Sequence, residues 1–115
     1  MLSDGLYRAR FATPIGEGSG VVHFFGGGQI VGGDSGFSYV GRMKQVGPDI
    51  SASIRVDQHD PGFASVFGPV TSFTINLTGR EDRGTATLTG VSPHAPGVAF
   101  SVFLTPLAVP LSAAA

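Results

Sequence analysis

Short apolar segments alternate with glycine-rich breaks along most of the chain, and this pattern predicts strands rather than helices. The segment Val21–Phe25 is β-branched and aromatic, and Gly26–Gly28 interrupts it. Strand-like residues resume at Gln29 and, after a second break, at Phe37. Valine, isoleucine and aromatic residues favour the pleated surface of a sheet, and glycine reaches the positive φ that tight hairpins need. We therefore expect antiparallel strands joined by tight turns.

Apolar and polar residues alternate in several of these segments, as in strands with one buried face. The alternation is clearest at 50–58, where Ile50, Ile54 and Val56 share one face with Ala52. The pattern predicts eight strands, at residues 5–13, 21–25, 29–31, 37–44, 50–58, 72–80, 85–91 and 98–105.

The stretch from His59 to Pro69 has no strict period and contains two prolines. Asp60 is placed to cap a helical turn that starts at Pro61, because proline is favoured at the first helical position. We expect a short helix or an irregular crossing segment here. Its apolar residues, Phe63, Val66 and Phe67, are expected to point inward.

Eight short strands with tight turns and no long helix close most simply into an up-and-down antiparallel β-barrel, which leaves no sheet edge exposed. We expect an all-β, lipocalin-like barrel, with an open two-sheet sandwich as the alternative. At 115 residues the chain is long enough for one domain. We assign residues 1–106 to the barrel and residues 107–115 to an apolar tail.

Composition narrows the classes of function. The net charge is −1, only 13% of residues are charged, and no Lys/Arg run is present, which disfavours direct nucleic-acid binding. The chain has no cysteine, which excludes disulfides and thiolate metal sites. No apolar run approaches the ~18 residues of a membrane helix, and the first residues lack a signal-peptide core. We expect a cytoplasmic protein that does not enter the membrane.

The sequence offers little support for catalysis or for a cofactor. His23, His59 and His94 are far apart and lack metal-ligand spacing. The glycine clusters at 16–20 and 26–28 precede strands, which makes them hairpin turns rather than phosphate-binding loops. No Gly-x-Ser-x-Gly elbow lies at a strand-to-helix turn. We therefore expect no enzymatic activity, no metal and no cofactor.

The inward faces of the predicted strands carry aromatic residues that are candidates for the wall of a ligand cavity. They are Tyr7, Phe11, Phe37, Tyr39, Phe73 and Phe100. An eight-stranded barrel either fills with side chains or holds one small ligand. Small inward residues leave room for a ligand, namely Ala9, Gly41, Ala52 and Gly79. The alternative is that the aromatic rings simply fill the core.

Large apolar residues also fall on the nominal outer faces. Strict alternation cannot turn all of them inward, and such residues are usually hidden in an interface. The candidates for this interface are Val22, Phe25, Val40 and Phe103. We expect a homodimer with two-fold symmetry.

Several short motifs, in order along nearly the whole chain, resemble the GrlR family. They are Asp4-Gly5-Leu6-Tyr7, Gly16-x-Gly-x-Gly, Ile30-x-Gly-Gly-Asp34, Tyr39-x-Gly41 and Phe100-x-Val-x-Leu104-x-Pro106-Leu107. GrlR is a negative regulator of type III secretion gene expression in attaching-and-effacing enteric bacteria. The resemblance implies a dimeric, lipocalin-like barrel without enzymatic activity that binds and blocks a transcriptional activator.

In that family an acidic segment in the loop after the fourth strand contacts the activator. The matching loop here is Gln45, Val46, Gly47, Pro48 and Asp49, in which only Asp49 is acidic. Two functions are therefore expected from the sequence. The first is a regulator that acts by protein binding, and the alternative is a carrier of a small apolar ligand inside the barrel.

Overall fold

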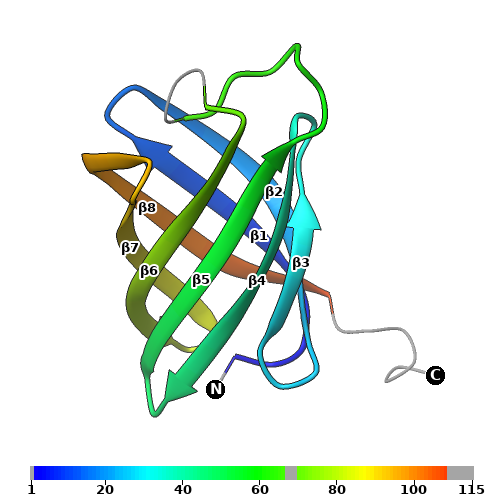
Figure 1. Ribbon diagram of the computed structural model, residues 1–115. Helices are drawn as coiled ribbons and strands as arrows, with labels where there is room; N and C mark the ends of the chain where they lie inside the picture. The colour runs from blue at the N-terminus through cyan, green and yellow to red at the C-terminus, as the bar shows by residue number, and fades with distance from the viewer. Residues whose placement is uncertain (1, 67–69, 109–115) are drawn as a thin grey trace.

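The computed structural model describes residues 2–66 and 70–108 and shows a closed antiparallel barrel of eight strands (Figure 1). The strands are β1 (Gly5–Thr13), β2 (Gly16–Phe25), β3 (Gln29–Gly33), β4 (Phe37–Val46), β5 (Asp49–Gln58), β6 (Ser72–Asp82), β7 (Thr85–Ser92) and β8 (Ala95–Ala108). Each strand pairs with the next, and β8 pairs with β1 to close the ring. The predicted eight-stranded up-and-down barrel is confirmed, and the open sandwich is wrong.

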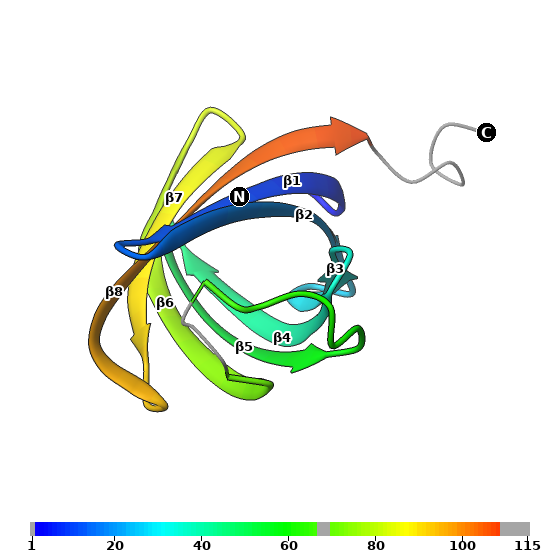
Figure 2. The same ribbon diagram turned by 90° about the horizontal axis from the view of Figure 1, so that it is seen from above.

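The period-two pattern directs side chains to the two sides of the barrel wall. On β5, Ile50 and Val56 are buried, whereas the intervening Ser51, Ser53 and Arg55 are exposed. Apolar residues on the inner faces of all eight strands form one continuous core. In Figure 2 the strands form a ring seen from above, and the β5–β6 connection passes over part of its opening.

The two ends of the barrel differ. At the end that carries the β2–β3, β4–β5 and β6–β7 turns, Leu2 is only 7% exposed and packs into the core. Its backbone N–H donates a hydrogen bond to Gln45 Oε1 at 2.9 Å. The N-terminal segment therefore closes this end. The other end carries the β1–β2, β3–β4, β5–β6 and β7–β8 connections.

The described part of the β5–β6 connection, residues 59–66, contains turns and bends but no helix. The predicted short helix is thus wrong, and the irregular alternative is correct. Asp60 caps a turn rather than a helix, because its Oδ1 accepts the Gly62 N–H at 2.9 Å. The His59 N–H donates a hydrogen bond to the Gly36 carbonyl at 2.8 Å, which ties this backbone to the neighbouring β3–β4 hairpin. Phe67 lies outside the described residues.

β2 and β8 extend furthest beyond the bounds that the hydropathy pattern indicates. β2 begins at Gly16, and its glycines pair in register with β1, including Gly18 with Phe11 and Gly20 with Ala9. β8 continues to Ala108, beyond the predicted barrel boundary at residue 106. Residues 109–115 of the predicted tail lie outside the described residues. In the part of the chain described, no helix is long and apolar enough to cross a membrane.

Candidate functional site

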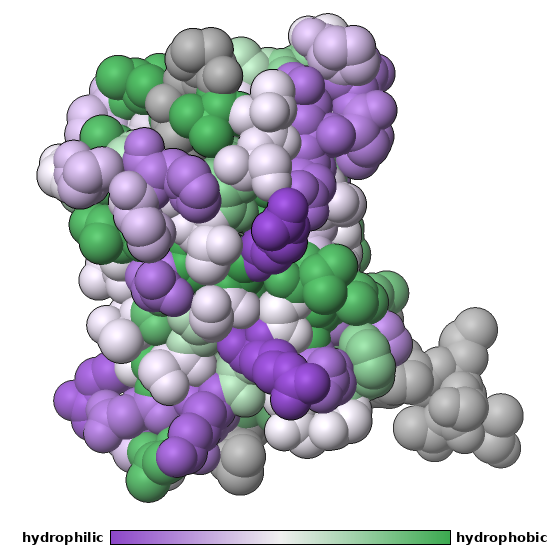
Figure 3. All heavy atoms as spheres, in the orientation of Figure 1, coloured by the Kyte–Doolittle hydropathy of each residue, from purple (hydrophilic) through white to green (hydrophobic). Residues whose placement is uncertain are grey.

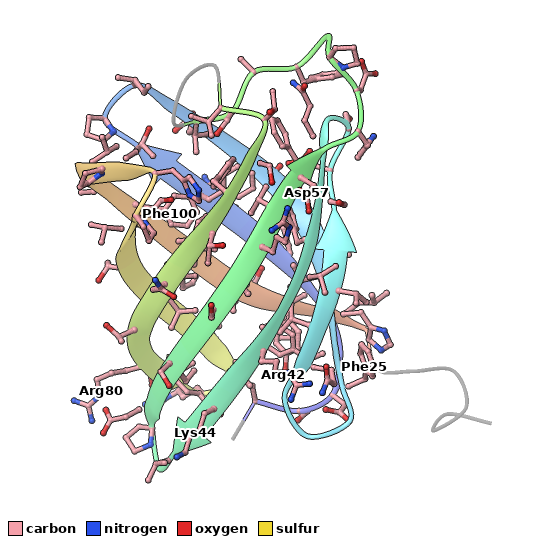
Figure 4. The ribbon with its side chains drawn as sticks, viewed as in Figure 1. Phe25, Arg42, Lys44, Asp57, Arg80 and Phe100 are labelled. Carbon is pink, nitrogen blue, oxygen red and sulfur yellow. The ribbon has the colours of Figure 1, made fainter. Side chains whose placement is uncertain are left out.

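A cavity of about 330 Å³ lies inside the barrel and extends toward the end that carries the β5–β6 connection. Its wall is mostly apolar. Of the six aromatic residues predicted for such a cavity, five line it, namely Phe11, Phe37, Tyr39, Phe73 and Phe100. Figure 4 shows one of them, Phe100, on the barrel wall between the β6 and β8 ribbons. Ile54, Leu88 and Val102 complete much of the apolar surface.

Tyr7, the sixth predicted residue, belongs to the closed end of the barrel and does not line this cavity. Its ring centroid lies 4.8 Å from that of Phe24. Its hydroxyl donates to the Ser3 backbone oxygen at 2.7 Å. Burial and the negative charge of Glu81 raise the pKa of the phenol. Tyr7 therefore has a structural role beneath the N-terminal segment.

Small residues shape the cavity, although not all of the predicted ones contribute. Ala9 and Ala52 line the space. Gly41 and Gly79 do not, because neighbouring backbone occupies the position of a side chain. A Cβ on Gly79 would lie 1.9 Å from the Thr87 carbonyl oxygen, and one on Gly41 would lie 2.2 Å from the Ser53 oxygen. These two glycines permit close approach of adjacent strands rather than opening the interior.

A phenol–carboxylate pair provides the main polar feature of the wall. The Tyr39 hydroxyl donates to Asp34 Oδ2. The other oxygen, Oδ1, accepts the backbone N–H groups of Gly36 at 2.9 Å and Phe37 at 2.8 Å. Burial, together with this hydrogen bond and the adjacent negative charge, raises the pKa of Tyr39 well above its ordinary value. Tyr39 is therefore neutral at physiological pH and keeps its oxygen available as an acceptor.

The β5–β6 connection is fastened over this end of the barrel at several points. The His59 ring Nε2 lies 3.0 Å from the Asp34 backbone oxygen. The Thr13 hydroxyl donates to the Val66 carbonyl. Phe63 and Val66 both line the cavity, and Phe63 lies directly over Gly36, where a Cβ would approach its side chain to 2.4 Å. The segment thus forms part of the cavity wall although it has no regular structure.

The remaining polar groups at the cavity are acidic or neutral. Ser35 and Ser65 contribute to the lining, and Glu17 and Ser19 border it from exposed positions on the outer face of β2. Among the described residues that line the cavity, none is Lys, Arg or His. All seven Lys and Arg side chains are exposed, and Figure 4 shows Arg42, Lys44 and Arg80 on the outside of the barrel.

The three histidines are far apart in the fold. His23 lies on the outer face, with its ring centroid 5.2 Å from that of Phe25. His59 is at the open end, and His94 contacts Ser92 Oγ at 3.4 Å in the β7–β8 turn. Within residues 2–66 and 70–108, no three His, Asp or Glu side chains gather in a way that could hold a metal ion.

The predicted partner loop is a tight β4–β5 hairpin turn at the closed end of the barrel. Gln45 is engaged inside the protein, because its Nε2 donates to the Gly47 carbonyl at 2.9 Å and its Oε1 accepts the Leu2 N–H. Asp49 lies 3.5 Å from Arg80 across the β5–β6 pair. Val46 is 67% exposed. This loop presents a short, mostly neutral surface.

Of the residues predicted for a dimer interface, Val22 is misplaced. It is 7% exposed and lines the cavity. Its partner in the β1–β2 register is Tyr7, which points inward, and the adjacent Val21 therefore faces outward. Phe25, Val40 and Phe103 are on the outer surface, as predicted.

Apolar side chains gather on the outer face of β1–β4, a region that we call the β1–β4 patch. It comprises Leu6, Val21, Phe25, Val31 and Val40. Val31 and Val40 are direct partners in the register. Figure 3 shows the β3–β4 part of this face, where apolar side chains gather with polar ones around them. Phe103 is on β8, where its β1 partner is Arg10, and it is not part of the patch.

Asp34 is the residue of the site that sequence reasoning missed. The pattern indicated only a turn, yet a usable signal was present. Ile30 is buried, and alternation along β3 places Gly32 and then Asp34 on the same inward face. Asp34 is thus an acidic residue on the inward face at the end of a strand, and the inward-facing Tyr39 follows five positions later. This spacing indicates that the two side chains pair across a short hairpin.

No protein-family model matches this chain, and a search of curated proteins found no match. The resemblance to the GrlR family therefore stays a prediction.

Proposed function

We propose that the protein binds a small apolar ligand inside its barrel and has no enzymatic activity. The observation that carries this proposal is the cavity of about 330 Å³ with its apolar wall. Binding pockets for small molecules have volumes of about 300–1,000 Å³ and combine apolar walls with a few polar groups. At ~30 Å³ for each water molecule, this volume corresponds to roughly eleven waters, and we infer a ligand of about ten heavy atoms.

The apolar surface of the cavity wall is accessible to water and can be covered by a ligand. Removing that surface from water contributes about 25 cal/mol for each Å². A ligand that fills the space gains this contribution without large rearrangement, because the strands already hold the wall in place. The polar pair of Tyr39 and Asp34 then orients one end of the ligand.

The test is binding of 1-aminonaphthalene, a neutral probe of suitable size whose fluorescence increases in apolar surroundings. We expect saturable binding to the wild-type protein. The variant Ala52→Phe places a ring in the cavity and should abolish binding. Ser53→Phe adds the same ring on the outer face of the same strand, and should leave binding unchanged. Equal binding by both variants would place the probe outside the barrel and refute the proposal.

A second candidate function is a regulator that acts by protein binding, in the manner that the resemblance to the GrlR family implies. The observation that favours it is the β1–β4 patch, since exposed apolar clusters mark interaction surfaces in many proteins. A homodimer that covers the patch is part of this proposal. Native mass spectrometry of the wild type and of a Val31→Lys variant tests it. A dimer that the variant disrupts supports the proposal, and a wild-type monomer contradicts it.

A further inference from the structure

The charge distribution at the cavity points to a particular class of ligand, an inference that rests on the proposed ligand-binding function. We propose that the cavity accepts an apolar amine, with its hydrocarbon part among the aromatic residues and its ammonium group beside Tyr39 and Asp34.

The hydrogen-bond donors beside Asp34 are already in use. The Tyr39 hydroxyl donates its only proton to Asp34 Oδ2, and the backbone N–H groups of Gly36 and Phe37 both donate to Oδ1. The phenol oxygen and the carboxylate therefore offer lone pairs to a ligand and no free proton. A polar end group that donates hydrogen bonds is satisfied by the Tyr39–Asp34 pair, whereas one that only accepts them finds no donor in this pair. An ammonium group has three donors and no acceptor.

Negative charge predominates at the polar end of the cavity. Asp34 lines it in the inward phase of the β3 alternation, and the ion pairs found in the described structure involve other carboxylates, those of Asp49, Asp57 and Asp82. All seven Lys and Arg side chains are exposed, and none of them lines the cavity. Residues 67–69, outside the described structure, contain no basic side chain. A carboxylate ligand would meet the like charge of Asp34 and no Lys or Arg, whereas an ammonium group meets an opposite charge.

The polar and apolar groups occupy different parts of the cavity. Asp34 begins the short connection between β3 and β4, whereas Leu77 and Leu88 line the interior from the middle of β6 and β7. The polar groups therefore lie toward the open end, and the apolar wall extends toward the centre. An elongated molecule with one polar end matches this arrangement. The hydrocarbon part is buried, and the ammonium group stays near water, which lowers the cost of its desolvation.

The experiment compares three ligands that have the same hydrocarbon chain, namely nonylamine, 1-nonanol and nonanoate. Each is titrated against the bound 1-aminonaphthalene probe at pH 7 and low salt, where exposed charges are least screened. We expect nonylamine to bind at least about tenfold more tightly than nonanoate, with 1-nonanol between them. The preference should decrease as salt is added.

Charge-neutralising variants test the role of the Asp34 carboxylate. Asp34→Asn should reduce the preference for amine over carboxylate. Glu17→Gln removes a negative charge from an exposed, outward-facing position at the same end of the barrel and should change the preference little. Asp82→Asn is the matched control, since it removes one exposed negative charge from the opposite end of the barrel. It should leave the preference unchanged.

The outcomes separate the two proposals. If nonanoate displaces the probe as well as nonylamine does, the inference about the ligand class is refuted while the ligand-binding function stands. If the probe binds in the cavity but Asp34→Asn does not change the order of the ligands, the assignment of Asp34 is also refuted. If neither the probe nor any of the three ligands binds, both proposals fail.

Discussion

Asp34 accepts three hydrogen bonds, and replacing it with alanine is the most informative test of how the open end of the barrel is built. The substitution removes the acceptor of two backbone N–H groups and of the Tyr39 hydroxyl. Tyr39 is 8% exposed. Its hydroxyl would lose its partner in a largely apolar environment. The β3–β4 connection would lose the side-chain bonds that define its turn.

The expected cost follows from these contacts. Hydrogen bonds to charged groups contribute about 1.5–3 kcal/mol each, and ordinary ones about 0.5–1.5 kcal/mol. We take about 1 kcal/mol for each backbone bond, because water can reach a turn at the end of the barrel, and about 1.5 kcal/mol for the buried hydroxyl. The sum is about 3–4 kcal/mol, a large fraction of the ~5–15 kcal/mol by which a small domain is stable.

Urea unfolding followed by circular dichroism measures this cost by linear extrapolation. Asp60→Ala is the matched control, because Asp60 accepts one N–H, that of Gly62, in an exposed turn. It should cost less than about 1 kcal/mol. A double-mutant cycle with Tyr39→Phe should give a coupling of about 1–2 kcal/mol between the phenol and Asp34. A loss below about 0.5 kcal/mol for Asp34→Ala, or zero coupling, would refute this account of the site.

Three further predictions concern the rest of the barrel. Burial raises the pKa of both tyrosines above 10.0, so folding favours the protonated phenols and the free energy of unfolding should fall as pH rises above 10. Absorbance at 295 nm should show less phenolate in the native protein than in the urea-unfolded protein at pH 10.5, and equal signals would contradict this. Gly90→Ala should destabilise the barrel by more than about 2 kcal/mol in urea unfolding, because the new Cβ would lie 1.8 Å from a backbone oxygen. Gly16→Ala is the control and should change stability little, because the nearest atom to its new Cβ would be 3.8 Å away. The hydrogen bond from the Ser72 hydroxyl, and after it the one from Arg55, lowers the pKa of the Asp57 carboxyl below 3.8. The ionised carboxylate therefore stabilises the fold, and this stabilisation is lost as pH falls through the lowered pKa. Ser72→Ala should raise the pKa of Asp57 in an NMR titration, and an unchanged pKa would rule out the hydroxyl as the main cause.

The strands whose hydropathy alternates were predictable from sequence, and those built on glycine were not. β5 begins within one residue of its predicted start and ends at the predicted residue, because polar and apolar residues alternate along it. The first half of β2 alternates glycine with polar residues and carries no hydropathy signal. It is a strand because β1 pairs with it in register, a contact that the local sequence does not encode.

The sequence of Val21–Phe25 alone does not indicate which of its side chains face inward, since apolar residues occupy both faces of the strand. The β1–β2 hairpin decides it. Thr13 pairs with Gly16, and the same register places Tyr7 opposite Val22. Tyr7 points inward, so Val22 does too, and Val21 is left outside. The length of the β1–β2 turn therefore determines whether a valine lines the cavity or joins the β1–β4 patch.

The aromatic residues and the glycines of this barrel form a single arrangement. The Phe11 ring lies over Gly18, where a Cβ would come within 2.8 Å of it, and Tyr39 lies over Gly20, where a Cβ would come within 3.0 Å of its hydroxyl. The missing side chains let both rings lie against the wall instead of filling the centre, which helps to leave the interior open. A side chain at residue 20 would also displace the Tyr39 hydroxyl from Asp34. The glycines of β2 thus contribute to both the volume of the cavity and the position of its polar group.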